Sequence, residues 1–190
     1  MAPLPRGAGY EFVDEIVGGA IPRQYIPAVD RGIQEASLRG ILAGFPLVDF
    51  KVEIFDGSYH SVDSNEQSFK MAGIMAFKTV APKCKPVLLE PLDELEIVTP
   101  EESLGDVLGD LSARRGHILG TESAVDGPGT RVRAVVPQSE LHLYASALQS
   151  MTHGRAVFHR HFRGYEEMPP DAAQRVVAEV AREQSATQAH

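Results

Sequence analysis

The pattern of apolar and polar positions predicts a half-buried strand that leads through a short loop into a long helix. Across residues 48–54 apolar and polar side chains alternate, and a period of two is typical of a strand with one face in a core. From about residue 65 to residue 81 apolar side chains recur with helical spacing, and Pro82 ends the run. The polar segment 57–63 is therefore expected to be a loop held between two regular elements.

The ends of this loop carry local signals of their own. Asp56-Gly57 breaks the alternation and favours a turn. Asp63 or Ser64 can cap the following helix, and Ser64 with Gln67 fits a capping box, in which two unpaired backbone donors are satisfied reciprocally. A rigidly presented loop suits recognition, but a solvated connection without a role explains the same residues, and local chemistry leaves both open.

The rest of the first half also predicts an α/β unit. Residues 1–9 form an extended lead-in, 10–17 a strand and 22–40 a helix that ends at Gly40. The helix over 65–81 has many small residues on its apolar stripe, and we expect that stripe to lie close to a sheet. Its members are Phe69, Ala72, Gly73, Ala76, Phe77 and Val80.

A change in composition at residues 83–86 marks a boundary, so we expect domains at 1–85 and 86–190. Thr99-Pro100 followed by glutamates predicts a capped helix start. The second half then has the order strand, helix, strand, strand, helix, strand, which is the split βαβ, ferredoxin-like plan. The segments are 87–98, 99–116, 117–123, 130–136 (a hairpin with its turn at 126–129), 138–150 and 156–162, followed by a terminal helix at about 170–183 and a disordered tail.

Composition narrows the functional classes. The net charge of −8 argues against nucleic-acid binding through bulk charge, although a local contact remains open. The single cysteine, Cys84, excludes an internal disulfide and fits a reducing compartment. No apolar run is long enough to span a bilayer and no signal peptide is recognisable, so we expect a cytoplasmic protein without membrane contact.

The common catalytic and metal-binding motifs are absent from the sequence. It has no phosphate-binding loop, no dinucleotide fingerprint, no H-E-x-x-H, no zinc-type cysteine pair and no G-x-S-x-G. His159 and His161 share one face of a strand, but no third metal ligand has recognisable spacing. We therefore assign no catalytic residue and no metal ligand. Arg114 and Arg115 suit a helix C-terminus through the helix dipole, and they can also bind phosphate.

Longer runs of sequence resemble one known family. GGAIPRQYIPAVDRGIQEA (18–36) and DGSYHSVDSNEQSFKMAGIMAFK (56–78) resemble domain IV of bacterial elongation factor G, the translocation GTPase. PVLLEPLDELEIVTPEESLGDVLGDLSARRGHILG (86–120) and SALQSMTHGRAVF (146–158) resemble its domain V. The likeness covers about residues 2–183.

The resemblance implies an α+β protein of two domains. The first is a truncated domain similar to domain 2 of ribosomal protein S5, and the second is the ferredoxin-like domain with its C-terminal helix. It also implies a monomer that binds the ribosome at the small-subunit decoding centre and at the stalk base and sarcin–ricin region of the large subunit, together with tRNA and mRNA. The family's tip loop would be Gly57, Ser58, Tyr59, His60, Ser61, Val62 and Asp63, with His60 nearest the A-site tRNA and codon, and the rRNA-contacting candidates would be Arg114, Arg115 and His117.

Parts of the family's plan are missing from this chain. The GTPase domain, domains II and III and the first part of domain IV have no counterpart, so we expect no enzyme activity and no cofactor here, GTP and Mg²⁺ belonging to an intact parent. The first sheet should expose an unpaired edge. Three other interpretations stay open: a paralogue for ribosome recycling or protection, a freestanding protein-interaction module, and a hydrolase that uses His60 and Asp63.

Overall fold

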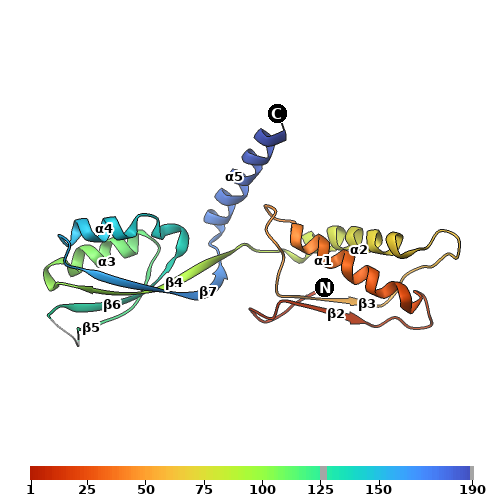
Figure 1. Cartoon of the computed structure of the whole chain (residues 1–190), viewed down its shortest axis with the longest axis horizontal. Coiled ribbons are helices and arrows are strands. Elements are labelled where there is room, and N and C mark those ends of the chain that lie inside the picture. The colour runs from red at the N-terminus through yellow and green to blue at the C-terminus, as the bar shows by residue number, and fades with distance from the viewer. Residues whose placement is uncertain (125–127, 189–190) are drawn as a thin grey trace. The chain divides into compact units, whose positions relative to one another are not determined.

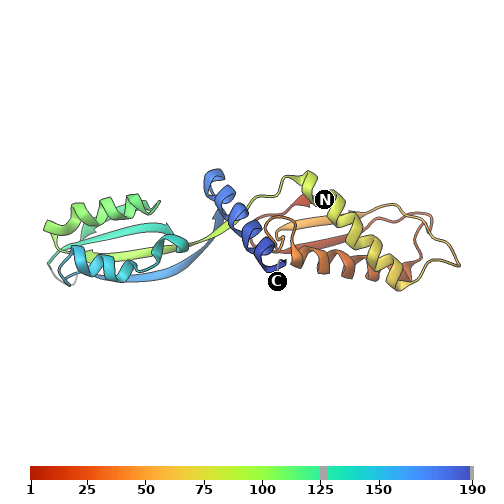
Figure 2. The ribbon, with the colours of Figure 1, turned by 90° about the horizontal axis from the view of Figure 1, so that it is seen from above.

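The computed structural model describes residues 1–124 and 128–188, and the chain divides into two compact units (Figures 1 and 2). The first unit is Met1–Leu88 together with the C-terminal segment that starts at Pro169, and the second is Leu89–Met168. Each unit combines one β-sheet with helices, which confirms the α+β class. The terminal helix α5 (Pro170–Gln188) groups with the first unit, whereas we expected it in the second, and it runs past the predicted end near residue 183.

The first unit has a three-stranded sheet in the order β1-β3-β2. Strand β2 pairs parallel to β3, and the short β1 pairs antiparallel to β3 on its other side. Figure 1 shows helices α1 and α2 over the same face of this sheet. The elements are β1 (Ala2–Pro3), β2 (Tyr10–Asp14), a 3₁₀ turn η1 (Arg23–Tyr25), α1 (Ile26–Arg39), β3 (Phe50–Ile54), α2 (Glu66–Val80) and a second 3₁₀ turn η2 (Ala81–Cys84).

Asp49 ties the N-terminal segment to β3. Its carboxylate accepts hydrogen bonds from the backbone N–H groups of Gly7 (3.0 Å) and Gly9 (2.9 Å). Burial raises the pKa of this carboxyl, but the two N–H donors and Arg6 outweigh burial, so the pKa lies below its ordinary value. Residues 1–9 are therefore bonded into the sheet, and not only an extended lead-in as the sequence predicted.

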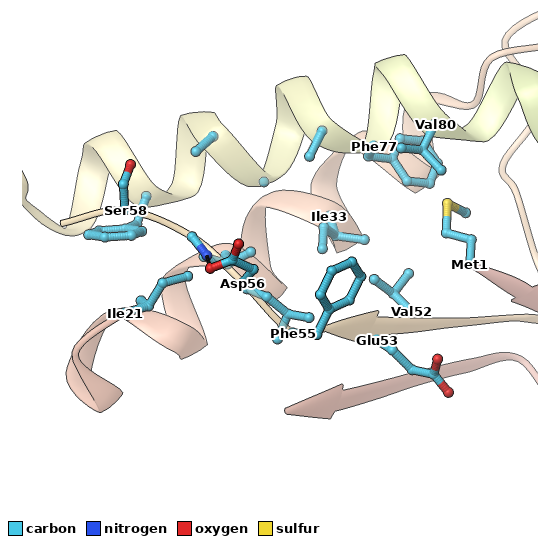
Figure 3. A pocket seen from close by; sticks show the side chains of 17 residues that line it. Met1, Ile21, Ile33, Val52, Glu53, Phe55, Asp56, Ser58, Phe77 and Val80 are labelled. Atoms are coloured by element: carbon cyan, nitrogen blue, oxygen red, sulfur yellow. Dashed lines mark hydrogen bonds between the residues drawn. The ribbon is translucent and has the colours of Figure 1, made fainter. Parts of the chain in front are cut away.

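Helices α1 and α2 lie side by side and touch through glycines (Figure 2). A Cβ atom on Gly73 would lie 2.5 Å from the carbonyl oxygen of Val29, and one on Gly32 would lie 2.2 Å from that of Lys70. The prediction that the small-residue stripe of α2 packs on a sheet is thus only partly right, because Gly73 fits against helix α1. Ala72, Ala76 and Val80 line a groove together with Gly73 itself and with Val52 and Ile54 of β3 (Figure 3).

The second unit has the predicted ferredoxin-like order, with four strands arranged β5-β6-β4-β7 and antiparallel pairing throughout. Helices α3 and α4 cover one face of the sheet (Figure 1), and a core that includes Leu95, Leu111 and Leu148 fills the space between them. The elements are β4 (Leu89–Thr99), η3 (Glu101–Ser103), α3 (Leu104–Ala113), β5 (His117–Ser123), β6 (Thr130–Pro137), η4 (Gln138–Leu141), α4 (Tyr144–Met151) and β7 (Val157–Glu167).

Two boundaries in this unit differ from the prediction. Thr99 does not cap a helix, because it pairs with Thr130 as the last residue of β4, and the helical path begins with a 3₁₀ turn after Pro100. The helix predicted from residue 138 is split at Leu143, whose φ is 55°. That break lets both Leu141 and Tyr144 reach the core. Residues 126 and 127 of the predicted 126–129 turn lie outside the described residues.

Candidate nucleic-acid interface

The loop between β3 and α2 is anchored by a stack of three aromatic rings. The ring of Tyr59 stacks on that of Tyr25 with centroids 6.0 Å apart, and Tyr25 stacks on Phe69 with centroids 4.9 Å apart. Phe69 is buried in the first turn of α2, so the loop is fastened to the core through rings from three separate segments. Sequence reasoning missed Tyr25, since it lies far from the loop along the chain and no local pattern marks it.

Two reciprocal hydrogen bonds close the end of the loop. The N–H of Ser64 donates to the carbonyl oxygen of His60 (3.0 Å), and the N–H of His60 donates to Oγ of Ser64 (3.0 Å). Ser64 therefore closes the loop and is not the helix cap that the sequence predicted. The cap is Asn65, whose side chain accepts from the N–H of Ser68 (2.9 Å) while the Ser68 hydroxyl accepts from the N–H of Asn65 (2.8 Å).

Gly57 is needed here for space and not for a turn. A Cβ atom at this position would lie 2.5 Å from Cδ1 of Ile21, which is buried. The expected turn at Asp56-Gly57 is wrong, because the turn residues are 61–63. Glycine thus lets the start of the loop lie directly on the segment that precedes α1.

The loop presents its side chains to solvent. Gly57, Ser58, Tyr59, His60, Ser61, Val62 and Asp63 are all exposed. Val62 is 91% exposed, whereas Tyr59 keeps 41% of its surface free although it is stacked. The backbone of His60 is held and its imidazole is exposed. An exposed imidazole on a loop that also carries an aromatic ring can stack on, or hydrogen-bond to, an unpaired nucleotide.

The geometry does not favour the hydrolase interpretation. Within the described residues no hydrogen bond joins the side chains of His60 and Asp63, and both are exposed. A general base normally lies within hydrogen-bond reach of a partner that orients it.

Replacing Ser64 with alanine should loosen the loop without unfolding the unit. The amide of His60 would lose its side-chain acceptor at a cost of about 1 kcal/mol, so its hydrogen exchange should become about fivefold faster. Exchange followed by NMR measures this directly, with Ser61→Ala as the matched control on a neighbouring exposed serine. Equal exchange of the His60 amide in the two variants would show that the Ser64 hydroxyl does not hold the loop.

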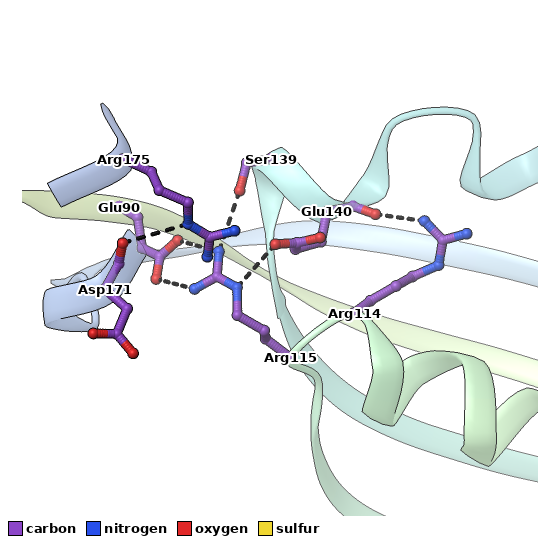
Figure 4. Close-up of polar contacts among 7 residues, drawn as sticks. All are labelled: Glu90, Arg114, Arg115, Ser139, Glu140, Asp171 and Arg175. Atoms are coloured by element: carbon purple, nitrogen blue, oxygen red, sulfur yellow. Dashed lines mark hydrogen bonds and ion pairs between the residues drawn. The ribbon is translucent and has the colours of Figure 1, made fainter. Parts of the chain in front are cut away.

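The arginines proposed for rRNA contact are engaged within the second unit (Figure 4). Arg115 makes a bidentate ion pair with Glu90 (2.8 and 2.9 Å) and a further pair with Glu140 (2.9 Å). The pKa of its guanidinium lies above the ordinary value, chiefly through the bonds to Glu90 and then to Glu140, against the opposing effect of burial. Arg114 bonds Asp110 (2.8 Å) and the Glu140 carbonyl oxygen (2.6 Å).

The end of helix α3 sets the position of both arginines. The N–H of Gly116 donates to the carbonyl oxygen of Leu111 (2.8 Å), and Arg115 has a left-handed backbone with φ of 60°. A Cβ atom on Gly116 would lie 2.6 Å from that same carbonyl oxygen, so only glycine fits there. His117, the third rRNA candidate, is exposed at the start of β5.

The other residues considered for metal binding or catalysis form no cluster in the described parts of the chain. Among the described residues no group of three or more His, Cys, Asp or Glu side chains is placed to hold a metal ion. His159 and His161 lie exposed on β7, opposite Glu96 and Glu94 of β4. Cys84 is exposed. No helix in the described ranges is long and apolar enough to cross a membrane.

The comparisons with known proteins all indicate the same family. The family model "Elongation factor G, domain IV" matches residues 1–85, and "Elongation factor G C-terminus" matches residues 87–176. An elongation factor G from Aquifex pyrophilus is 51% identical over 177 residues, which are 93% of this chain and 25% of that protein. An elongation factor G-like protein from Thermotoga maritima is 50% identical over 183 residues, 96% of this chain and 27% of that protein.

The structural comparison agrees with these matches. A crystal structure of a Thermus thermophilus protein superposes with a TM-score of 0.80 and 45% identity, covering 93% of this chain and 26% of that one. Two domains of the type found in a translation factor are present in this chain, and the first of them carries the exposed loop 57–63. It belongs to the elongation factor G family, as the sequence predicted, and it spans about a quarter of the length of the curated relatives it matches.

Proposed function

We propose that this chain is the C-terminal, ribosome-binding portion of an elongation-factor-G-type GTPase that promotes movement of tRNA and mRNA. The observation that carries the proposal is the closed, ring-anchored loop 57–63, exposed at every position on a domain that matches domain IV. In this proposal the loop enters the A site of the decoding centre, and His60 lies nearest the tRNA and codon.

The loop would act by position and not by acid–base chemistry. Ser64 closes the backbone of the loop, and the ring of Tyr59 stacks on that of Tyr25. A nucleotide would therefore meet a surface that is already ordered. Pre-ordering lowers the entropy lost on binding. GTP hydrolysis would belong to other domains of a parent protein, since both family matches in this chain are to domain IV and the C-terminus.

We propose that the second unit contacts rRNA of the large subunit mainly through His117 and the backbone around it. The guanidinium of Arg115 donates hydrogen bonds to the carboxylates of Glu90 and Glu140. The guanidinium of Arg114 donates to the carboxylate of Asp110 and to the carbonyl oxygen of Glu140. Their part in this contact would therefore be to hold the end of α3 in place, while His117 is exposed.

Co-sedimentation of this chain with bacterial ribosomes at low and moderate salt tests the proposal. Wild type should pellet with ribosomes and be released as salt rises, because phosphate contacts release counterions. His60→Ala should bind about tenfold more weakly, in line with the loss of one stacked or hydrogen-bonded base contact. His142→Ala, which removes an exposed histidine from the second unit, is the matched control and should bind as wild type does.

Two results would contradict the proposal. If wild type and His60→Ala pellet with ribosomes equally well, the side chain of His60 makes no contact that contributes to binding. If it fails to pellet at any salt, these domains do not bind the ribosome by themselves.

A further inference from the structure

The segment that precedes helix α1 contacts loop 57–63 at both of its ends. At the first end, a Cβ atom on Gly57 would lie 2.5 Å from Cδ1 of Ile21, so the two backbones approach closely. At the second end, the ring of Tyr25 stacks on that of Tyr59 with centroids 6.0 Å apart. The segment and the loop therefore form one continuous surface at this end of the first unit.

Arg23 lies in the middle of that segment, and the fold makes no use of its side chain. It is exposed in the 3₁₀ turn η1, two residues from Ile21 and two from Tyr25. Within the described residues no hydrogen bond or ion pair includes its guanidinium. A cation that precedes the N-terminus of α1 also lies at the unfavourable end of the helix dipole. The stability of the first unit therefore does not account for Arg23.

The charges around Arg23 make its position significant. The segments 14–25 and 55–66 contain no other Lys or Arg. Their carboxylates are Asp14, Glu15, Asp56, Asp63 and Glu66. A nucleic-acid strand carries a negative charge at each phosphate, so these carboxylates repel its backbone unless a phosphate lies beside the one cation.

We propose that Arg23 binds a backbone phosphate of the RNA strand whose base meets His60. The planar guanidinium offers two parallel donors, which match two oxygens of a phosphate. The phosphate contact would position the strand, and the loop would contact the base. This proposal rests on the ribosome-binding function proposed above, and it adds a residue outside the loop to the surface that meets RNA.

The neighbours of Arg23 favour RNA over an acidic peptide. An arginine alone pairs with a carboxylate as readily as with a phosphate. Here the same surface also carries the ring of Tyr59 and the imidazole of His60, both exposed. A cation beside aromatic groups is typical of single-strand binding sites, where bases stack while the backbone meets the positive charge.

Co-sedimentation with ribosomes over a range of salt concentrations tests the proposal on the whole chain. Arg23→Ala should bind at least about tenfold more weakly than wild type, the loss expected for a hydrogen bond to a charged group. The plot of log binding constant against log salt should become shallower by about 0.7, the value for one phosphate of a single strand. Arg23→Lys should keep the salt slope, whereas His60→Ala should weaken binding without changing it.

Arg39→Ala is the matched control for loss of one positive charge. Arg39 is exposed at the last residue of α1 and pairs with Glu35 (3.2 Å). Because α1 has 14 residues, its two ends are about 21 Å apart, about twice the Debye length at 0.1 M salt. Arg39→Ala should therefore pellet as wild type does, with the same salt slope. Thermal unfolding of Arg23→Ala should match wild type, since the side chain holds nothing in the fold.

NMR of the free chain with a uridine hexanucleotide gives a readout that needs no ribosome. The side-chain Nε–H signal of Arg23 and the amide signals of loop 57–63 should shift together as RNA is added, and salt should reverse both shifts. Hexaglutamate at the same concentration should leave the Nε–H signal of Arg23 unshifted.

Failure of this proposal is distinguishable from failure of the ribosome proposal. Equal pelleting of Arg23→Ala and Arg39→Ala would overturn the contact at Arg23, and so would an unshifted Nε–H signal while the loop amides respond. A shift with hexaglutamate as large as that with RNA would assign Arg23 to an acidic peptide. Wild type that does not pellet, but whose Arg23 and loop signals shift with RNA, would overturn the ribosome proposal alone. No pelleting together with no shift would overturn both.

Discussion

Replacing Gly73 with alanine should destabilise the first unit by about 2 kcal/mol, although alanine is the better helix former by about 1 kcal/mol. The added Cβ would lie 2.5 Å from the carbonyl oxygen of Val29, an atom of the α1 backbone that cannot rotate away. The two helices would have to separate, which loosens the packing of Phe69 and Phe77. Overpacking of this kind typically costs about 1–3 kcal/mol, and a clash with backbone belongs at the upper end of that range.

Glycines of α3 supply the matched control. Beyond its chain neighbours and the backbone of its own helix, a Cβ atom on Gly109 would meet nothing within 4 Å. Gly109→Ala should therefore be neutral or should stabilise the second unit by up to about 1 kcal/mol. Hydrogen exchange by mass spectrometry in increasing urea reports each unit separately. If the first unit of Gly73→Ala is as stable as wild type, the close approach of α1 and α2 is not required by the fold.

The sequence predicted the positions of most elements because their apolar periodicities are strong. The ferredoxin-like order of the second half and the helix after the tip loop are confirmed with small shifts in their bounds. Hydrophobic spacing indicates which face of a helix or strand is buried, but it does not indicate whether that face packs on a sheet or on another helix. Gly73 shows this limit, because its stripe was assigned to a sheet and Phe77 of that stripe does meet Phe50 of β3, whereas Gly73 itself packs on helix α1.

The candidate site was located by the family resemblance and not by local chemistry, and what holds it is visible only in the structure. Ser64 and Asn65 are adjacent polar residues, and either can cap a helix by sequence rules. Their roles separate because Ser64 also meets the N–H of His60. The stack on Tyr25 depends on a contact between segments far apart in sequence, for which no periodicity exists.

The sequence also does not reveal which partners its charged side chains have. A pair of arginines at a helix end is compatible with phosphate binding and with internal ion pairs. The positions of Glu90 and Glu140 in the structure favour internal ion pairs. Glu90 is 5% exposed, so its carboxylate depends on a partner. An arginine that neutralises a buried carboxylate would leave that charge uncompensated if it moved to bind RNA.

Replacing Arg115 with alanine should therefore lower the free energy of unfolding of the second unit by about 3 kcal/mol. Removing one partner of a buried pair typically costs about 3–5 kcal/mol, and the lower end applies here because the Arg115 side chain is 29% exposed. Arg115→Lys keeps the charge but loses the planar fork, so it should fall between alanine and wild type. Urea titration with exchange at β4 and β6 measures the loss.

A double variant separates this structural role from contact with rRNA. Glu90→Leu with Arg115→Met removes both charges and fills the space with apolar side chains, and such replacements of buried pairs are often neutral or stabilising. We expect the double variant to recover most of the stability that Arg115→Ala loses, and to pellet with ribosomes as wild type does. A folded double variant that no longer pellets would instead show that Arg115 contacts rRNA, and that its bonds to Glu90 and Glu140 give way when the chain binds.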